Sequence, residues 1–116
     1  MPPSVIAVAA LLPALSATTS HAEVPNSIAK LLGPAVGYLL SQSDLCQWGL
    51  TGDIEKTYRN GFKTMGMTAA QQASTWSQAV ARRKALADLP ASAKARMKAD
   101  TCTPALRARV EGDLAD

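Results

Sequence analysis

The sequence predicts an all-α protein: a small bundle of four or five short helices held by one disulfide, after an N-terminal signal peptide. Apolar residues recur at spacings of three and four along most of the chain. Helix-start and helix-stop signals divide this pattern, and no run alternates apolar and polar residues over the length of a strand. With 116 residues, of which 47% are hydrophobic and 18% charged, the chain has material for one ordered domain. We expect that helical domain to occupy residues 23–116.

Residues 1–22 read as a secretory signal. The run Val5–Leu15 is apolar and uncharged, and the small residues Ser20 and Ala22 fit the positions that signal peptidase reads, so we expect cleavage after Ala22. The segment before the run departs from the usual pattern because it contains no Lys or Arg. An uncleaved anchor and a misassigned start are the alternatives, although the run is shorter than the roughly 20 apolar residues of a membrane span. We therefore expect an exported chain without a stable membrane anchor, more in keeping with a bacterial periplasm than with the extracellular medium.

The expected cleavage removes His21, which is the only histidine. A mature chain without histidine excludes Ser-His-Asp and Cys-His nucleophilic catalysis, as well as histidine-based metal sites. No phosphate-binding glycine loop, haem-attachment motif or nucleotide-binding motif is present either. We expect no catalytic residue, no metal site and no cofactor.

The first predicted helix begins at Asn26, a residue type that often caps helices. Seven apolar residues then recur on one face and are expected to be buried: Ile28, Leu31, Leu32, Ala35, Val36, Leu39 and Leu40. Gly33-Pro34 interrupts this pattern, because a proline ring removes one helical hydrogen bond and crowds the preceding turn. We expect one bent helix or two abutting helices.

The same face continues to Trp48, and Gly49 is the expected stop. Within this first helix, Gly33 and Gly37 have the spacing of two small residues one turn apart. Such a pair lets a second helix approach closely, although Pro34 lies between them and the signal is weak outside a membrane.

The second helix is expected from around Asp53, with an apolar stripe of Ile54, Tyr58, Phe62 and Met65. Its end is expected early, because Asn60-Gly61 favours a turn.

Thr68 and Gln71 form a capping box, the clearest helix start in the chain. The third helix should run from there to about Asp88. Its expected buried side consists of Ala69, Ala73, Trp76, Ala79, Val80 and either Leu86 or Ala87.

Leu89-Pro90 ends that helix, and a short polar helix over 91–99 should follow, with only Ala93 and Met97 facing inward. Thr103-Pro104 is a good cap and first turn for the last helix. The narrow apolar stripe of that helix comprises Leu106, Val110 and Leu114.

Cys46 and Cys102 are the only cysteines, and an even number in a small exported chain predicts a disulfide. A redox site usually has Cys-x-x-Cys, and a metal site needs more ligands, so neither alternative has its sequence context. The bridge would tie the weak fourth helix to the end of the first.

Positive charge is concentrated in residues 82–109, which hold eight basic and two acidic side chains. The eight basic residues form a possible patch for an anionic partner: Arg82, Arg83, Lys84, Lys94, Arg96, Lys98, Arg107 and Arg109. A plain solvated surface is the alternative. Nucleic acid is not expected, because no aromatic residue follows Trp76 to stack on bases and the spacing matches no known motif.

Two further sets of residues are candidates for a site. Trp48, Met65 and Met67 are expected either to line a groove or simply to pack, as large apolar side chains near helix ends usually do. Three carboxylates, Asp44, Asp53 and Glu55, are the only suggestion of an acidic catalytic cluster. The expectation for Asp53 and Glu55 is instead a favourable interaction with the positive end of a helix.

In architecture the chain resembles the small acid-stress chaperones of the bacterial periplasm, which share a signal peptide, a similar mature length, an all-helical fold and one disulfide. The resemblance extends to no motif beyond the two cysteines, and no functional residue is transferred from it. The expected function is non-enzymatic binding of an unknown protein partner or client. A periplasmic stress chaperone is the alternative, and a carboxylate-based enzyme or accessory subunit is less favoured.

Overall fold

A computed structural model describes residues 24–115, which form five α-helices and contain no strand. The helices are α2 (Asn26–Leu45), α3 (Thr51–Thr64), α4 (Ala69–Ala87), α5 (Ala91–Thr101) and α6 (Pro104–Ala115). The predicted signal peptide lies outside the described residues. None of the described helices is both long and apolar enough to cross a bilayer. The all-helical class, the number of helices and the Cys46–Cys102 disulfide are confirmed.

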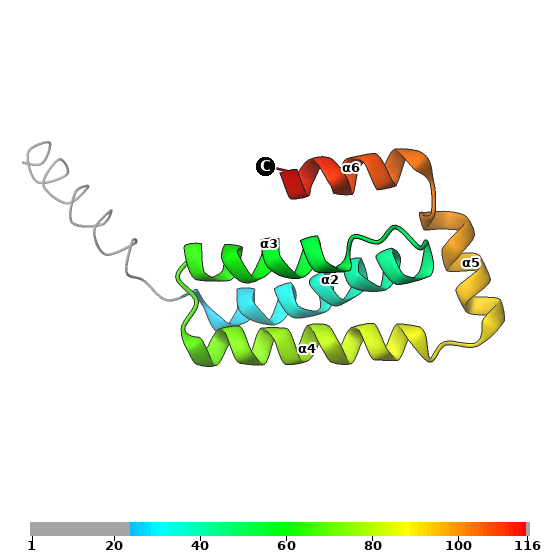
Figure 1. Ribbon diagram of the computed structural model, residues 1–116. Coiled ribbons are helices and arrows are strands. Elements are labelled where there is room, and N and C mark those ends of the chain that lie inside the picture. The colour runs from blue at the N-terminus through cyan, green and yellow to red at the C-terminus, as the bar shows by residue number, and fades with distance from the viewer. Residues whose placement is uncertain (1–23, 116) are drawn as a thin grey trace, which may run out of the picture.

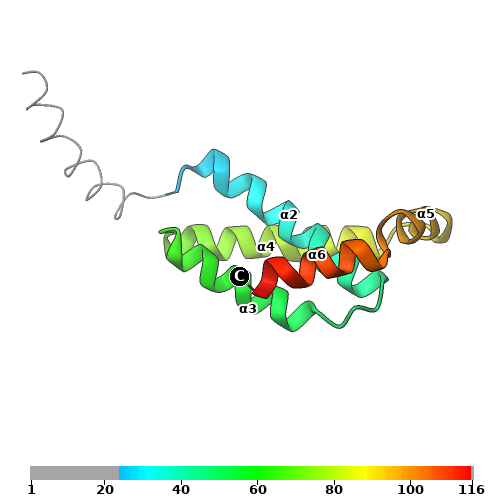
Figure 2. The same cartoon turned by 90° about the horizontal axis from the view of Figure 1, so that it is seen from above.

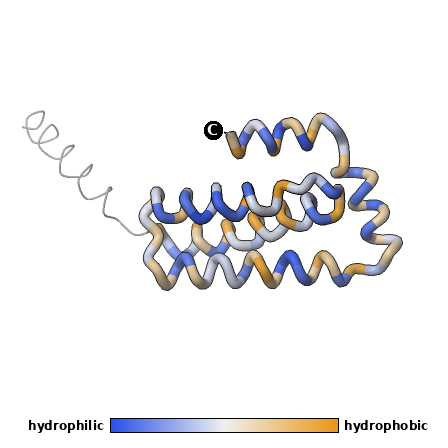
Figure 3. The backbone as a smooth tube through the Cα atoms, viewed as in Figure 1, coloured by the Kyte–Doolittle hydropathy of each residue, from blue (hydrophilic) through white to orange (hydrophobic). Residues whose placement is uncertain are grey.

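Helices α2 and α4 run parallel, with α3 antiparallel beside them (Figure 1). Helix α5 crosses the end of this three-helix unit at which α2 and α4 terminate, and α6 then returns over α3, as the view from above also shows (Figure 2). Each of the described helices contains both apolar and polar residues (Figure 3).

Helices α2 and α4 pack closely at two glycines of α2. A Cβ atom on Gly33 would lie 2.7 Å from the Cβ of Gln78, and one on Gly37 would lie 2.5 Å from the carbonyl oxygen of Ala79. Neither position has room for a side chain. The two backbones therefore approach closely, as the predicted spacing of small residues allows. Pro34 is contained within a single helix, which is one of the two outcomes expected for this segment.

The glycine contact rotates α2 away from its expected orientation. Its buried residues are Ala29, Gly33, Val36, Gly37, Leu40, Ser41, Gln42 and Ser43. The prediction of a buried face containing Ile28 and Leu31 was wrong, since these side chains are 47% and 68% exposed. Close approach at small residues, rather than burial of the largest apolar ones, determines which side of α2 faces the bundle.

The same contact corrects the expected face of α4. Thr75 and Ala79 are its buried residues, whereas Val80 is 49% exposed and Trp76 is half-buried beneath the guanidinium of Arg59. Ala69 and Ala73, also expected on the inner side, are exposed. Burial of a methyl group provides little free energy, so Ala69 and Ala73 contribute little to the orientation of α4.

Four helix boundaries differ from those predicted. Asn26 is the first residue of α2 rather than its cap, and its side chain accepts a hydrogen bond from Gln71 at 3.0 Å. Helix α2 ends at Leu45 rather than near Trp48, and α3 begins at Thr51. Helix α3 also continues through Asn60-Gly61, because Phe62, the next residue, is buried in the core and holds the last turn in place.

The remaining elements follow the sequence prediction closely. The capping box of α4 is complete, with hydrogen bonds of 3.1 Å in both directions between Thr68 and Gln71. The Thr103 side chain caps α6, accepting from the Leu106 N–H at 3.2 Å. On α6, Val110 is buried, and Leu106 and Leu114 pack against the core.

Candidate functional site

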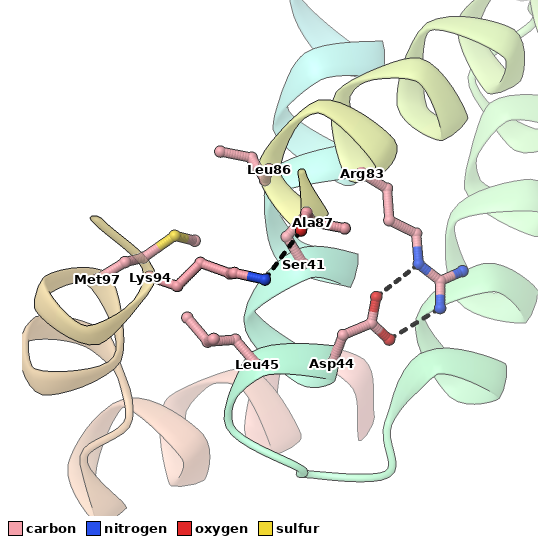
Figure 4. Close-up of a pocket in the computed structure, with 8 residues that line it drawn as sticks. All are labelled: Ser41, Asp44, Leu45, Arg83, Leu86, Ala87, Lys94 and Met97. Carbon is pink, nitrogen blue, oxygen red and sulfur yellow. Dashed lines mark hydrogen bonds and ion pairs between the residues drawn. The ribbon is translucent and has the colours of Figure 1, made fainter. Parts of the chain in front are cut away.

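A cavity of about 180 Å³ lies where α5 meets the carboxyl-terminal ends of α2 and α4 (Figure 4). We refer to it as the α2–α4–α5 cavity. Its lining residues are Ser41, Asp44, Leu45, Arg83, Leu86, Ala87, Lys94 and Met97. Protein interiors are close-packed, so a space of this size at a junction of three helices is a candidate binding site.

One edge of the cavity is an ion pair between α4 and α2. The Arg83 guanidinium donates two hydrogen bonds to the Asp44 carboxylate, at 2.7 and 2.8 Å. The hydrogen bond to Asp44 raises the pKa of Arg83 above its usual value, so this side chain stays charged at any physiological pH. The pair therefore fixes one cation and one anion in place.

The second cation of the cavity is Lys94 on α5. Its Nζ lies 3.0 Å from the carbonyl oxygen of Ala87, the last residue of α4 (Figure 4). Carbonyls in the last turn of a helix lack partners within the helix, and lysine is a favourable neighbour for them. An ammonium group has three donors, so two of them are left for a ligand.

The disulfide places α5 across the cavity. Cys46 directly follows α2 and Cys102 directly follows α5, and their Cα atoms are 5.2 Å apart. Helix α5 contains no fully buried residue, so packing alone holds it weakly. The bridge therefore fixes the wall that carries Lys94 and Met97, in addition to stabilising the fold.

The eight predicted patch residues have different surroundings. Arg83 and Lys94 line the cavity. Lys84 pairs with Asp88 at 2.9 Å, and Arg107 lies 3.7 Å from Glu111 and donates to the Trp48 carbonyl. No carboxylate of residues 24–115 lies within ion-pair distance of the other four, which are Arg82, Arg96, Lys98 and Arg109.

The structure does not bring the predicted groove residues together. Trp48 precedes α3, whereas Met65 and Met67 follow it, so they lie at opposite ends of that helix. Trp48 and Met67 are 6% and 5% exposed, and Met65 is 46% exposed.

Trp48 and Met67 instead have equivalent roles at two helix ends. At the end of α2, the Trp48 N–H donates to the carbonyl of Ser43 in the last turn. At the end of α3, the Met67 N–H donates in the same way to the carbonyl of Phe62. Each bond closes a Schellman motif, in which a left-handed residue is followed by an apolar one that packs on the helix. The left-handed residues are Gln47, with φ 55°, and Gly66, with φ 91°.

Replacing Gln47 with glycine is expected to stabilise the protein by up to about 1 kcal/mol. The left-handed conformation is costly for a residue with a Cβ atom and not for glycine, and the gain is partly offset by the greater freedom of glycine in the unfolded chain. Thermal unfolding of Gln47→Gly beside the parent protein measures this. An unchanged or lower melting temperature would contradict the assigned role of Gln47.

The three candidate carboxylates are not assembled into one site. Asp44 binds Arg83, Glu55 lies 3.3 Å from Arg59, and Asp53 faces a separate depression between α3 and α6. Residues 24–115 also contain no group of three or more side chains placed to hold a metal ion.

Sequence reasoning missed most of the cavity. Ser41, Leu45, Leu86, Ala87 and Met97 were not identified as site residues, and Asp44 was considered only as a catalytic carboxylate. The signal that points to the cavity is the disulfide, because joining the ends of two helices brings the residues before Cys46 and Cys102 together.

Comparison with protein-family models, with characterised proteins and with solved structures finds no match to this chain.

Proposed function

We propose that the chain is an exported, non-enzymatic binding protein whose ligand occupies the α2–α4–α5 cavity. The observation that carries the proposal is the cavity itself, which combines apolar side chains with fixed charges. Leu45, Leu86 and Met97 supply the apolar surface, and Arg83, Asp44 and Lys94 supply the charges. Ligand sites in proteins typically have this composition: a mainly apolar lining with a few placed polar groups.

Export is supported by two features of the chain. The N-terminal sequence has the apolar run and small residues of a signal peptide, and Cys46 and Cys102 are paired. Disulfides form and persist in oxidising compartments, such as the bacterial periplasm. A periplasmic location is therefore part of the proposal.

A nuclear magnetic resonance screen tests the binding function. Oxidised, ¹⁵N-labelled protein expressed with its own leader is mixed with a library of small acids, amines and neutral compounds. We expect some compounds to shift the backbone amide signals of residues 41–45, 83–87 and 94–97 in a saturable manner. If no compound shifts these signals, or if every shift lies elsewhere, the cavity is not a binding site.

A stress chaperone is the second candidate, favoured by large apolar side chains on the outside of the bundle. Ile28 and Leu31 on α2 and Val80 on α4 are each about half exposed or more. Light scattering of an aggregating client at acidic pH, with and without the protein, tests this role. Suppression that is lost in Leu31→Gln but kept in the neighbouring Lys30→Gln would support it, and the absence of any suppression would eliminate it.

A further inference from the structure

We infer that the α2–α4–α5 cavity binds a small carboxylic acid with an apolar body of about the size of a benzene ring. This inference rests on the proposed binding function and adds the chemical class of the ligand. Three properties of the cavity lead to it: its volume, its net charge and the balance of its hydrogen-bond donors and acceptors.

The volume limits the apolar body of the ligand to about the size of one six-membered ring. An apolar cavity of about 150 Å³ is enough for benzene, so a cavity of about 180 Å³ accommodates a ring or a short alkyl chain. Leu45 from α2, Leu86 from α4 and Met97 from α5 supply apolar contacts from three directions (Figure 4). Methionine adapts its shape to a ligand more easily than branched side chains do.

The charge of the lining favours an anion. Arg83 and Lys94 are cationic, and Asp44 is the only acidic residue among the eight, so one formal positive charge remains after the Arg83–Asp44 pair is formed, offset in part by the carbonyls that end α4. That remaining charge belongs to Lys94, whose Nζ donates to the Ala87 carbonyl (Figure 4). A ligand anion at this position gains a charge-assisted hydrogen bond.

The hydrogen-bond inventory gives the same answer. Arg83 uses two of its five N–H donors on Asp44, and Lys94 uses one of three on the Ala87 carbonyl. The Asp44 carboxylate is well engaged, because it receives both Arg83 bonds and a longer one of 3.4 Å from Thr51. The free donors of Lys94 lie at the edge of an apolar space, whereas the unbonded nitrogen of Arg83 points away from Lys94 and Met97 (Figure 4). Free donors in that position favour a ligand with acceptor oxygens, such as a carboxylate.

Three probes of similar size and different charge test the ligand class. Benzoate, benzylamine and benzyl alcohol are titrated separately into the oxidised, ¹⁵N-labelled protein, and dissociation constants are obtained from the amide shifts of residues 41–45, 83–87 and 94–97. We expect benzoate to bind about tenfold or more tightly than either of the others, as one charge-assisted hydrogen bond provides.

Two variants assign the preference to one residue. Lys94→Met keeps the length of the side chain and removes its charge, so we expect benzoate binding to weaken about tenfold and benzyl alcohol binding to change little. Lys98→Met is the matched control, because Lys98 lies one turn further along α5, is exposed and does not line the cavity. Its benzoate affinity should equal that of the parent protein.

The outcomes separate the ligand class from the binding function. If benzylamine or benzyl alcohol binds the cavity as tightly as benzoate, or if Lys94→Met binds benzoate unchanged, the carboxylate inference is wrong and the binding function stands. If none of the three probes shifts the cavity amides, the carboxylate inference is overturned, and the library screen decides whether the binding function falls with it.

Discussion

Removing the disulfide is expected to cost about 4 kcal/mol of folding stability, the largest effect of any change considered for this protein. The bridge joins residues 56 positions apart, and the chain-entropy estimate for a loop of that length is about 4 kcal/mol. Stabilities of small domains are about 5–15 kcal/mol, so much of the total depends on this bond. In a Cys46→Ser, Cys102→Ser double variant the melting temperature should fall by roughly 15–30 °C.

The double variant also separates the two roles assigned to the bridge. Helix α5 has no buried residue of its own. When the double variant is heated, the amide signals of residues 94–97 should therefore lose their chemical-shift dispersion at a lower temperature than those of core residues such as Val36 and Ile54. Reduction of the parent protein with a thiol reagent should have the same effect. A melting temperature within a few degrees of the oxidised protein would show that α5 is held by packing instead.

Replacing Gly37 with alanine is expected to destabilise the protein by about 3 kcal/mol or more. The added Cβ would lie 2.5 Å from the carbonyl oxygen of Ala79 and 2.7 Å from the Cβ of Arg82, and neither is the free end of a flexible side chain. Helices α2 and α4 would have to separate along their contact, and overpacking of this kind typically costs about 1–3 kcal/mol and occasionally more. Urea unfolding, followed by circular dichroism, gives the free energy of unfolding.

Gly61→Ala is the matched control for that experiment. Gly61 also lies inside a helix, but no atom lies within 4 Å of the position of an added Cβ. Alanine has the higher helix propensity, so this variant should be more stable than the parent by about 0.5–1 kcal/mol. If Gly37→Ala and Gly61→Ala change stability by the same amount and in the same direction, the close α2–α4 contact is not present in solution.

The sequence predicts the elements of this fold better than the way they face one another. Local signals are sufficient for the capping box at Thr68, the Thr103 cap and the disulfide, because each depends on residues whose chemistry has one main use. The orientation of α2 is not predictable from its apolar pattern, because apolar residues surround much of that helix and the pattern includes the exposed Ile28 and Leu31. The glycine spacing was visible in the sequence, but only the structure shows that α4 occupies it.

The candidate site was less predictable for a related reason. Lys94 and Arg83 lie in a stretch where most basic side chains are exposed, and nothing in their local sequence distinguishes them from Lys98 or Arg96. Their common position at the cavity depends on the parallel course of α2 and α4, which brings two helix ends to the same side of the bundle, and on the bridge that holds α5 there. Both are properties of the whole chain.

The disulfide also makes a closed covalent ring of residues 46–102. Three of the four connections between helices lie within this ring: residues 46–50, 65–68 and 88–90. The fourth connection, residues 102–103, begins at Cys102, where the ring closes. A protease that cuts once within any of the three leaves a single covalently joined molecule, with every helix still attached. For a protein proposed to work among the proteases of an exported compartment, the bridge therefore confers tolerance to a first cut, which folding stability alone would not provide.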